Sequence, residues 1–586
     1  MASLPEIPTD SALSRLFETE KARGDAVWFS LPGGATLYNS GEPSDTLYFV
    51  RAGRLGAFRR DENGESQFLG VIRPGEPAGE MALISGAAHS GHVVALRDSE
   101  IFALPRSVFF EACEQEPEVM IELARLMIRR SRQAATKASV GEPSVFGFIS
   151  VGDPGPIRPL VEKMGREVGK LGYSVTILGS EVQHAPTEWF SEVERDYDFV
   201  LYVAETGDHS WRTVVGRQVD RLFRIGLGEK VAPAETIHKE PLQAQNLVDL
   251  ILIHKRNTVR PQGSEAWLES VKPARLFHMR RDHSEDLKRI ARVLTGQSVG
   301  LVLSGGGARA YAHIGAIQVL REQGVPIDFV CGASMGAIIA AGVAMGWDQA
   351  EMDARIQDAF VNTSPLDDIA IPLLAMTLGL KVNERLAQHF GETQIADLWL
   401  PFFCVSSNLT KGTYQLHRRG RLRDALRASI SLPGILPPAT DDNDVLVDGA
   451  VLKNFPADIM RMSMLGPIVG IDVTRGRSIT AADVARPASV WRWIISGQWR
   501  KGPPIVSLLM RAATVSSGRD LIASRDATDV LVLPEVVGVE IRDWTAYDPA
   551  VTGGRLAMTE ALKKLTRPVT DLRRRSSRHE PDQPLI

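Results

Sequence analysis

Residues 299–342 constrain this chain more than any other part, because they contain two strand–turn–helix units in close succession. In the first unit, Val299–Leu303 is an apolar run with the length of a buried strand. The glycines Gly305–Gly307 follow this run, and glycine lets the backbone turn tightly and approach a ligand closely. A helix predicted to begin at Ala308 would direct its free N–H groups and its dipole at that ligand.

The second unit is built around a serine. A short apolar strand ends at Cys331, and Gly332–Gly336 then fits the pattern G-x-S-x-G with Ser334 at its centre. This pattern turns the chain sharply from strand to helix and exposes the serine hydroxyl at the carboxyl end of the strand. A nucleophile beside a loop of N–H donors is the layout that acyl transfer requires, so the two units together predict that chemistry.

Two other interpretations of these units compete with acyl transfer. Both turns could serve only to pack an α/β domain, without any chemistry. Dinucleotide binding fits poorly, because Gly305–Arg309 lacks the G-x-G-x-x-G spacing and no acidic residue follows at the next strand end about 20 residues on. Acyl transfer is the interpretation that accounts for both units.

A serine nucleophile needs a base, and the histidines are badly placed to supply one. In the usual α/β-hydrolase order, an acid and then a histidine follow the serine, but only His579 lies beyond the best acid candidate. That candidate is Asp448, which ends a short apolar strand and precedes a glycine. An aspartate there can reach Ser334 and take its proton directly. We interpret His313, in the helix after the glycine loop, as a packing residue.

Three blocks of the sequence resemble the patatin-like phospholipases: Gly305–Arg309, Gly332–Gly336 and Asp448–Ala450. Three further segments, Arg292–Gly296, Arg427–Pro433 and Lys453–Pro456, extend the resemblance to the neuropathy target esterase branch, whose members are lysophospholipases. The resemblance implies a C-terminal patatin-like α/β hydrolase. It also implies a serine–aspartate dyad, a glycine-rich oxyanion hole and an acyl-enzyme intermediate, with no metal and no cofactor.

The substrate class follows only from this resemblance: a glycerophospholipid acyl ester, and above all a lysophospholipid. The alternatives are a serine esterase for soluble substrates and a ligand-sensing scaffold with a vestigial hydrolase. The resemblance implies Ser334 as the nucleophile and Asp448 as the base. It implies an oxyanion hole formed by Gly305, Gly306 and Gly307, with Arg309 supporting that loop. Gly332 and Gly336 are the implied glycines of the nucleophile turn.

The length of 586 residues predicts several domains, in a multidomain α/β architecture. Spaced turn signals predict an N-terminal β-roll over residues 11–135, and alternating strands and helices predict a doubly wound α/β scaffold over 145–281. The hydrolase is expected over 284–566, and 567–586 is expected to be a disordered tail. A net charge of −4 gives no reason to expect a nucleic-acid partner.

The N-terminal segment resembles cyclic-nucleotide-binding domains, in Gly34–Glu42 and Leu47–Arg54. Glu80 matches the glutamate that binds ribose in that family, whereas His89 stands where the family has its phosphate-binding arginine. A histidine offers a single donor and gains charge only near its ordinary pKa of about 6.5. The sequence therefore leaves open whether a cyclic nucleotide binds or whether the domain serves only for packing.

The expected location is the cytoplasm, with peripheral contact to a membrane. The N-terminus has no apolar signal-peptide core, no apolar run is long enough to span a bilayer, and three scattered cysteines indicate a reducing compartment. Residues 488–513 combine Trp491, Trp493 and Trp499 with cationic neighbours, a composition suited to lipid headgroups. A lid, a membrane contact and a domain interface are the alternatives for this stretch.

Overall fold

The computed structural model describes residues 12–13, 15–16, 24, 27–60, 66–135, 143–233, 247–363, 366–370, 375–474, 517–536 and 538–577. The chain divides into two compact units. The first consists of Met1–Gly226, Pro233–Leu250 and Ser576–Ile586, and the second of Leu227–Ala232 and Ile251–Arg575.

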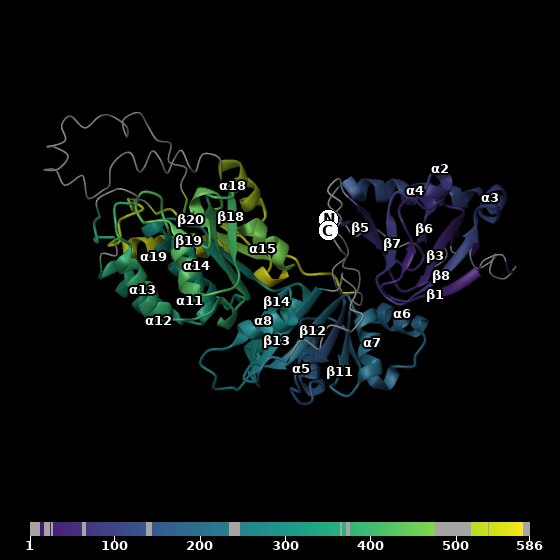
Figure 1. Cartoon of the computed structure of the whole chain (residues 1–586), viewed down its shortest axis with the longest axis horizontal. Coiled ribbons are helices and arrows are strands. Elements are labelled where there is room, and N and C mark those ends of the chain that lie inside the picture. Colours follow the sequence, from purple (N-terminus) through teal and green to yellow (C-terminus); the bar gives the residue numbers. More distant parts are fainter. Residues whose placement is uncertain are drawn as a thin grey trace. The chain divides into compact units, whose positions relative to one another are not determined.

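The first unit begins with a β-roll, built from two antiparallel sheets of four strands in the orders β1-β8-β3-β6 and β2-β7-β4-β5 (Figure 1). Apolar and polar residues alternate along β3, so that Leu47 and Phe49 face a core shared with Phe109 and Leu123 from the helices that follow. The elements are β1 (Val27–Leu31), β2 (Thr36–Tyr38), β3 (Thr46–Ala52), β4 (Leu55–Arg60), β5 (Ser66–Ile72), β6 (Pro77–Ala78), α2 (Glu80–Ser85), β7 (His92–Ala95), β8 (Ser99–Pro105), α3 (Arg106–Gln115) and α4 (Pro117–Ala135).

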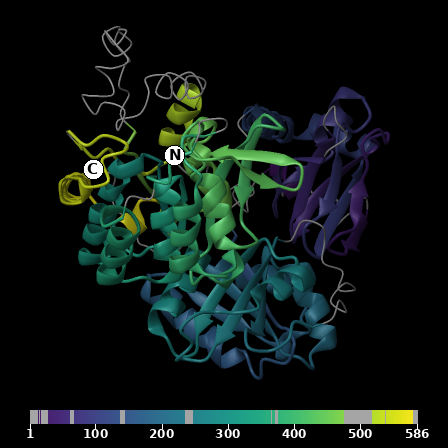
Figure 2. The ribbon, with the colours of Figure 1, turned by 60° about the vertical axis from the view of Figure 1, so that its left-hand side comes forward.

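A six-stranded sheet in the order β10-β11-β9-β12-β13-β14 follows. Figure 2 shows this blue to teal part of the ribbon, with helices beside its strands. Its strands β9 and β11 are buried along their whole length, as continuous apolar runs in a parallel sheet should be. Strand β12 is not predicted by its sequence, because Arg221 and Arg224 interrupt its apolar pattern. The elements are β9 (Val145–Ser150), α5 (Arg158–Lys170), β10 (Val175–Leu178), α6 (Thr187–Asp196), β11 (Phe199–Ala204), α7 (His209–Gln218), β12 (Arg221–Leu227), β13 (Leu247–His254), α8 (Ser264–Val271) and β14 (Arg275–Arg280).

One boundary between the two units falls within β12, between Gly226 and Leu227. They therefore do not separate the chain at the ends of the predicted domains. The limits 11–135, 145–281 and 284–566 stay a prediction.

The second unit contains an eight-stranded sheet in the order β19-β20-β17-β16-β15-β21-β22, with β18 beside β17. Its main elements are α9 (Ser284–Thr295), β15 (Gly300–Leu303), α10 (Tyr311–Glu322), β16 (Phe329–Ala333), α11 (Met335–Met345), α12 (Gln349–Ile356), α13 (Leu380–Phe390), β17 (Phe402–Asn408), β18 (Thr413–His417), α14 (Leu422–Ser429), β19 (Ala439–Asp441), β20 (Asp444–Asp448), α15 (Ala457–Ser463), β21 (Ile468–Ile471), α18 (Ser517–Asp526), β22 (Val530–Val532) and α19 (Tyr547–Lys563).

The register of this sheet brings two distant loops to one edge. Strands β15 and β16 are parallel neighbours, so the loops that follow Leu303 and Ala333 leave the sheet together. Ala333 pairs with Val405 of β17, and the next residue of β17, Ser406, pairs with Asp448 at the end of antiparallel β20. Asp448 therefore lies at the level of the residue after Ala333, although more than a hundred residues separate the two in sequence.

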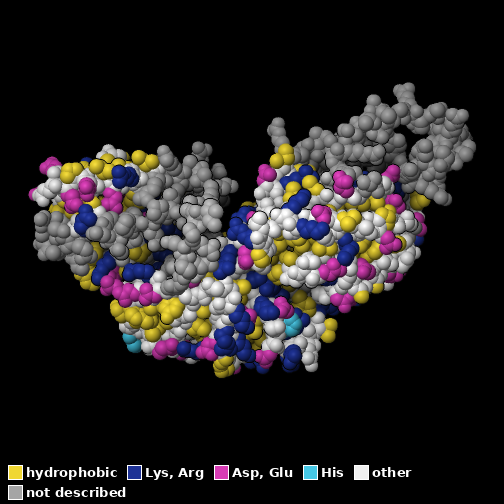
Figure 3. All heavy atoms as spheres, turned by 180° about the vertical axis from the view of Figure 1, so that it is seen from behind, with side chains coloured by type: hydrophobic (Ala, Val, Ile, Leu, Met, Phe, Trp, Pro, Cys, Tyr) yellow, Lys and Arg dark blue, Asp and Glu magenta, His cyan; other side chains and the backbone are white. Residues whose placement is uncertain are grey.

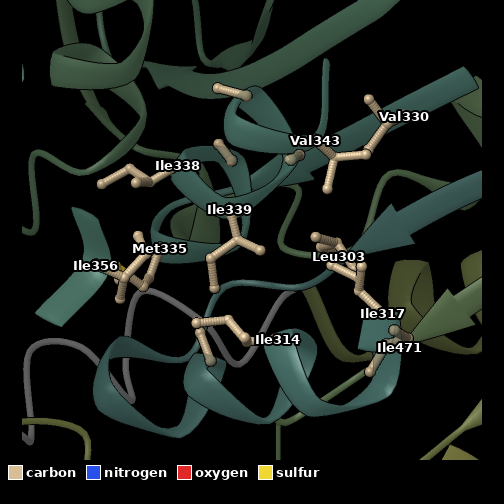
Figure 4. Close-up of a cluster of buried hydrophobic side chains, with 14 of the residues drawn as sticks. Leu303, Ile314, Ile317, Val330, Met335, Ile338, Ile339, Val343, Ile356 and Ile471 are labelled. Atoms are coloured by element: carbon tan, nitrogen blue, oxygen red, sulfur yellow. The ribbon is translucent and has the colours of Figure 1, made fainter. Parts of the chain in front are cut away.

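A large apolar core holds this edge in place. Every residue of α11 from Met335 to Ala344 is buried, which is the behaviour of a helix that is apolar all round. Figure 4 shows Ile339 of this helix in one cluster with Ile314 of α10 and Leu303 of β15. The strand ends and the helices that begin there are thus fixed by the same packed side chains.

The C-terminal segment corrects one expectation. Residues 567–577 were predicted to be disordered, but a short 3-10 helix spans Val569–Asp571, and Val569 packs into the core. Arg573 Nε donates to Asp529 Oδ1 at 2.7 Å, and Ser577 Oγ donates to Asp198 Oδ2 at 2.8 Å. The prediction failed because a segment poor in apolar residues is ordered here by polar contacts. Residues 578–586 lie outside the described part of the chain.

Charged side chains of both signs are spread over the face shown in Figure 3.

None of the helices in the described ranges has the length and hydropathy needed to cross a bilayer. Within the same ranges, no group of three or more His, Cys, Asp and Glu side chains is arranged to hold a metal ion. The predicted lipid-contact residues Trp491, Trp493 and Trp499 fall outside the described residues.

Candidate active site

Ser334 sits on a strained turn between β16 and α11. Its backbone has φ 52° and ψ −131°, a conformation that costs a non-glycine residue roughly 1–3 kcal/mol. The neighbouring glycines make the turn sterically feasible. A Cβ on Gly336 would lie 2.4 Å from the Ser304 carbonyl oxygen, and one on Gly332 would lie 2.6 Å from the carbonyl carbon of Gly336. The strain at Ser334 presents its hydroxyl at the sheet edge.

Asp448 accepts a hydrogen bond directly from the hydroxyl of Ser334. Ser334 Oγ donates to Asp448 Oδ2 at 2.6 Å, and the other carboxylate oxygen accepts from the Ala450 N–H at 2.8 Å. Asp448 is only 1% exposed, and this burial raises its pKa from 3.8 to about 6, against the lowering effect of the two hydrogen bonds. The group is therefore ionised at neutral pH and is a stronger base than an ordinary carboxylate.

Buried serines, which the sequence analysis did not single out, hold the backbones of both residues. The Ser334 N–H donates to Ser429 Oγ at 2.9 Å, and Ser429 Oγ donates in turn to the Val405 carbonyl at 2.7 Å. Ser407 Oγ donates to the carbonyl of Asp448 at 2.9 Å. The Arg427–Pro433 block contained Ser429, but only the fold reveals its partner.

The glycine loop lies beside Ser334, and it corrects one assignment. The sequence assigned the N–H groups of Gly305, Gly306 and Gly307 to the oxyanion hole. In the structure the Gly305 N–H donates to the Asn454 carbonyl at 3.3 Å, so it is not available to a substrate. Among the described residues, no acceptor is found for the N–H groups of Gly306 and Gly307. The prediction of an oxyanion hole therefore narrows to the N–H groups of Gly306 and Gly307.

Contacts beyond the glycines support the loop from its far side. The Ala308 N–H donates to the Ile541 carbonyl at 2.8 Å, and Arg309 Nε donates to the Val539 carbonyl at 2.8 Å. Gly307 has φ 57°, and a Cβ there would lie 2.2 Å from the Ile541 carbonyl oxygen. Arg309 thus acts on the segment that packs against the loop, and only glycine fits at position 307.

His313 does not face the nucleophile. It is fully buried, and its Nε2–H donates to the Ser304 carbonyl at 2.8 Å. Burial lowers its pKa to about 4, so the imidazole is neutral at physiological pH. The histidine therefore supports the strand end before the glycine loop, and Asp448 is the titratable side chain in contact with Ser334.

Three segments of the chain match family models. Residues 28–116 match the Cyclic nucleotide-binding domain, residues 170–280 the Neuropathy Target Esterase family P-loop like domain, and residues 301–461 the Patatin-like phospholipase. An uncharacterized NTE family protein of Mycobacterium tuberculosis is 30% identical over 572 residues, which cover 94% of each chain. The chain belongs to the NTE family.

Other relatives of this NTE family member are longer. Lysophospholipase NTE1 of Cryptococcus neoformans is 28% identical over 92% of this chain and 38% of the fungal protein. Patatin-like phospholipase domain-containing protein 7 of Rattus norvegicus is 27% identical over 80% of this chain and 40% of the rat protein. The expected resemblance to the patatin-like and neuropathy target esterase families is confirmed, as is the multidomain α/β fold with an N-terminal β-roll.

In this NTE family member, the predicted nucleotide residues of the roll are engaged by the chain itself. Glu80 Oε1 accepts from Arg130 Nη1 of α4 at 2.7 Å, and only 4% of Glu80 is exposed. The ring of His89 stacks on Tyr38 with the centroids 3.7 Å apart. Burial lowers the pKa of His89 below 6.5, so this imidazole gains a positive charge only at a lower pH than an ordinary histidine does.

These contacts predict that cAMP does not bind to the native protein. Ribose would have to displace Arg130 from Glu80, and His89 provides no charge for the phosphate. Calorimetry on the full chain at pH 8 should show no binding heat up to ~1 mM cAMP, a concentration that reveals even a dissociation constant of about 1 mM. His89→Arg alone should restore little affinity, because Glu80 stays paired. Micromolar binding by the native protein would contradict this interpretation.

The pKa of Asp448 predicts the pH dependence of the enzyme. The base must be ionised, so kcat/KM should fall about tenfold for each pH unit below 6 and level off above it. The measurement is the initial rate on an ester with no group that titrates between pH 4 and 9, with the product quantified by mass spectrometry at each pH. An acid limb centred near 4 would mean that the essential base is an ordinary carboxylate.

Proposed function

We propose that this NTE family member hydrolyses lysophospholipids, with Ser334 as nucleophile and Asp448 as general base. The observation that carries the proposal is the 2.6 Å hydrogen bond from Ser334 Oγ to the buried carboxylate of Asp448. A base with a pKa of about 6 is ionised at pH 7 and can still accept a proton in the transition state. The contact therefore has both the geometry and the basicity that the reaction needs.

Membership of the NTE family and the Patatin-like phospholipase match make the chain a lipid ester hydrolase. The choice of lysophospholipids is supported by the relative from Cryptococcus neoformans, which is named a lysophospholipase. That protein is much longer than this chain, so the shared activity is part of the proposal.

The first half of the reaction forms an acyl-enzyme. Ser334 Oγ attacks the ester carbonyl carbon while its proton passes to Asp448 Oδ2. Negative charge then develops on the carbonyl oxygen, where the N–H groups of Gly306 and Gly307 and the N-terminal end of α11 stabilise it. When the tetrahedral intermediate collapses, the bond to the glycerol oxygen breaks, and that oxygen takes the proton from Asp448.

The second half releases the fatty acid. A water molecule gives a proton to Asp448 as its oxygen attacks the acyl carbon, and the same two N–H groups hold the oxyanion again. Collapse of this intermediate breaks the bond to Ser334 Oγ, which recovers its proton from Asp448. The dyad returns to its starting state without a metal or cofactor in either half.

The substrate class can be tested with purified full-length protein and a panel of esters. Lysophosphatidylcholine, diacyl phosphatidylcholine and a soluble short-chain nitrophenyl ester should be compared, with products identified by mass spectrometry. We expect free fatty acid and glycerophosphocholine from the lysolipid, at a higher kcat/KM than for the other two esters. A higher kcat/KM for the soluble ester, together with a rate on the lysolipid that does not rise when the lysolipid forms micelles, would favour an esterase for soluble substrates. No turnover of any ester would favour a vestigial hydrolase.

A further inference from the structure

Asn454 touches the glycine loop at two points. Its carbonyl oxygen accepts from the Gly305 N–H at 3.3 Å, and its side-chain Nδ2 donates to the Gly305 carbonyl oxygen at 3.3 Å. The side chain also lies close to the nucleophile. A Cβ added to Gly305 would lie 2.5 Å from Asn454 Oδ1 and 2.9 Å from Ser334 Cβ. Asn454, the glycine loop and Ser334 thus converge on one small space.

The orientation of the Asn454 amide follows from its neighbours. With Nδ2 toward the Gly305 carbonyl, the amide makes a hydrogen bond, whereas the flipped amide would set two oxygen atoms against each other. Oδ1 is buried and has no hydrogen-bond partner among the described residues. A buried polar atom without a partner destabilises the protein, so Oδ1 does not hold the side chain in place. The hydrogen bond from Nδ2 to the Gly305 carbonyl oxygen holds it.

The contact with the Gly305 carbonyl also fixes a neighbouring N–H group. In a trans peptide the C=O and the N–H point in opposite directions, and the N–H of this peptide unit belongs to Gly306. The hydrogen bond from Asn454 Nδ2 to the Gly305 carbonyl therefore orients the Gly306 N–H away from the Asn454 side chain. The following peptide is fixed in the same way, because the Gly306 carbonyl accepts from the Arg309 N–H at 3.3 Å, which orients the Gly307 N–H.

We propose that Asn454 is a positioning residue that orients the Gly306 N–H toward the oxyanion of the tetrahedral intermediate. This inference rests on the proposed function, since it assigns a role within the same reaction. The backbone contact from Gly305 to the Asn454 carbonyl could be made by any residue at position 454. The side-chain contact is specific, because it needs an N–H donor on a short side chain.

Asn454→Leu is the variant that tests the role. Leucine has a similar size but no hydrogen-bond donor in its side chain. The Gly305–Gly306 peptide is then free to rotate, and the Gly306 N–H no longer points toward the oxyanion. We expect kcat to fall about 10²-fold, the lower end of the cost of losing one oxyanion donor, with KM changed less than about threefold. Asn257→Leu, the same substitution at an exposed position, is the matched control and should keep native kinetics.

Two inhibitors separate a positioning role from a merely structural one. A trifluoromethyl ketone lysolipid analogue forms a tetrahedral adduct with Ser334 and uses the oxyanion donors, so its Ki should rise about as much as kcat falls. An ether-linked lysophosphatidylcholine has no ester carbonyl, and its Kd should stay unchanged. Weakened binding of both ligands to Asn454→Leu would overturn the proposal, because it would indicate general damage to the site.

A native kcat in folded Asn454→Leu would also overturn the proposal, while leaving the proposed function intact. The reverse holds for the function: if the native protein turns over no lysolipid, the dyad assignment fails before Asn454 is tested. Should the leucine variant unfold, Asn454→Ala is the smaller replacement without a side-chain donor. It must show the same loss in kcat and in ketone affinity, and an alanine variant with native values contradicts the proposal.

Discussion

Ser334→Ala and Asp448→Asn are each expected to remove nearly all esterase activity, and the double variant should be little worse than either single one. The reason is that the two groups act as one unit: without the carboxylate the hydroxyl cannot lose its proton, and without the hydroxyl there is no nucleophile. A loss of roughly 10⁴–10⁶ in kcat is the range found when a member of such a unit is removed. Steady-state kinetics on lysophosphatidylcholine measure it.

Thermal unfolding provides the control for these two variants. The folded-state pKa of Asp448, about 6, lies above its ordinary 3.8, so the buried carboxyl favours its neutral form. The stability that it contributes is therefore complete below pH 3.8 and is lost as the pH rises through 6. Asp448→Asn should accordingly melt at or above the native temperature at pH 8.

A double variant far slower than both single ones would show that the two residues act independently.

Gly307→Ala is expected to lower kcat by about 10²–10³ with little change in KM, the scale of losing one oxyanion donor. A Cβ at this position would lie 2.2 Å from a backbone oxygen of Ile541, and its φ of 57° disfavours any other residue. The loop must shift to accommodate alanine, so the Gly307 N–H leaves its place. A rise in KM at constant kcat would mean that the loop binds substrate without stabilising the transition state.

Gly306 offers a matched comparison, because its obstacle is a side chain. A Cβ there would lie 2.4 Å from Val473 Cγ2, while its φ of 178° lies outside the left-handed region. Gly306→Ala should therefore lose activity through this clash alone, and adding Val473→Ala should restore most of it. No such partner can rescue Gly307→Ala. The contrast between the two glycines separates steric displacement of the loop from general loss of folding.

The parts of the site that the sequence predicted are those in which local geometry demands particular residues. Ser334 stands on a turn that only flanking glycines permit, and Asp448 ends a strand whose register sets it at the same sheet edge. Such features leave a pattern in the residues themselves. The assignment of the Gly305 N–H was wrong because the glycine pattern specifies a loop and does not say which of its donors another segment has already taken.

The supporting contacts could not be predicted, because their partners come from distant segments. Ser429, Asn454 and Arg130 are ordinary polar residues in the sequence, and only the fold brings them to Ser334, Gly305 and Glu80, respectively. Strand β12 was missed for a related reason. Its arginines break the apolar pattern, but Arg221 pairs with Asp249 of β13 in the fold, and the strand takes its place in the sheet.

The most direct measurement of the central claim is covalent labelling of the native full-length protein with a fluorophosphonate. The account predicts one label for each chain, recovered on the peptide that contains Ser334, and none on Ser334→Ala. Labelling of native protein should also slow as the pH falls below about 6, as Asp448 becomes protonated. A label that persists in folded Ser334→Ala, or that maps to another residue, would contradict the assignment of Ser334 as the nucleophile.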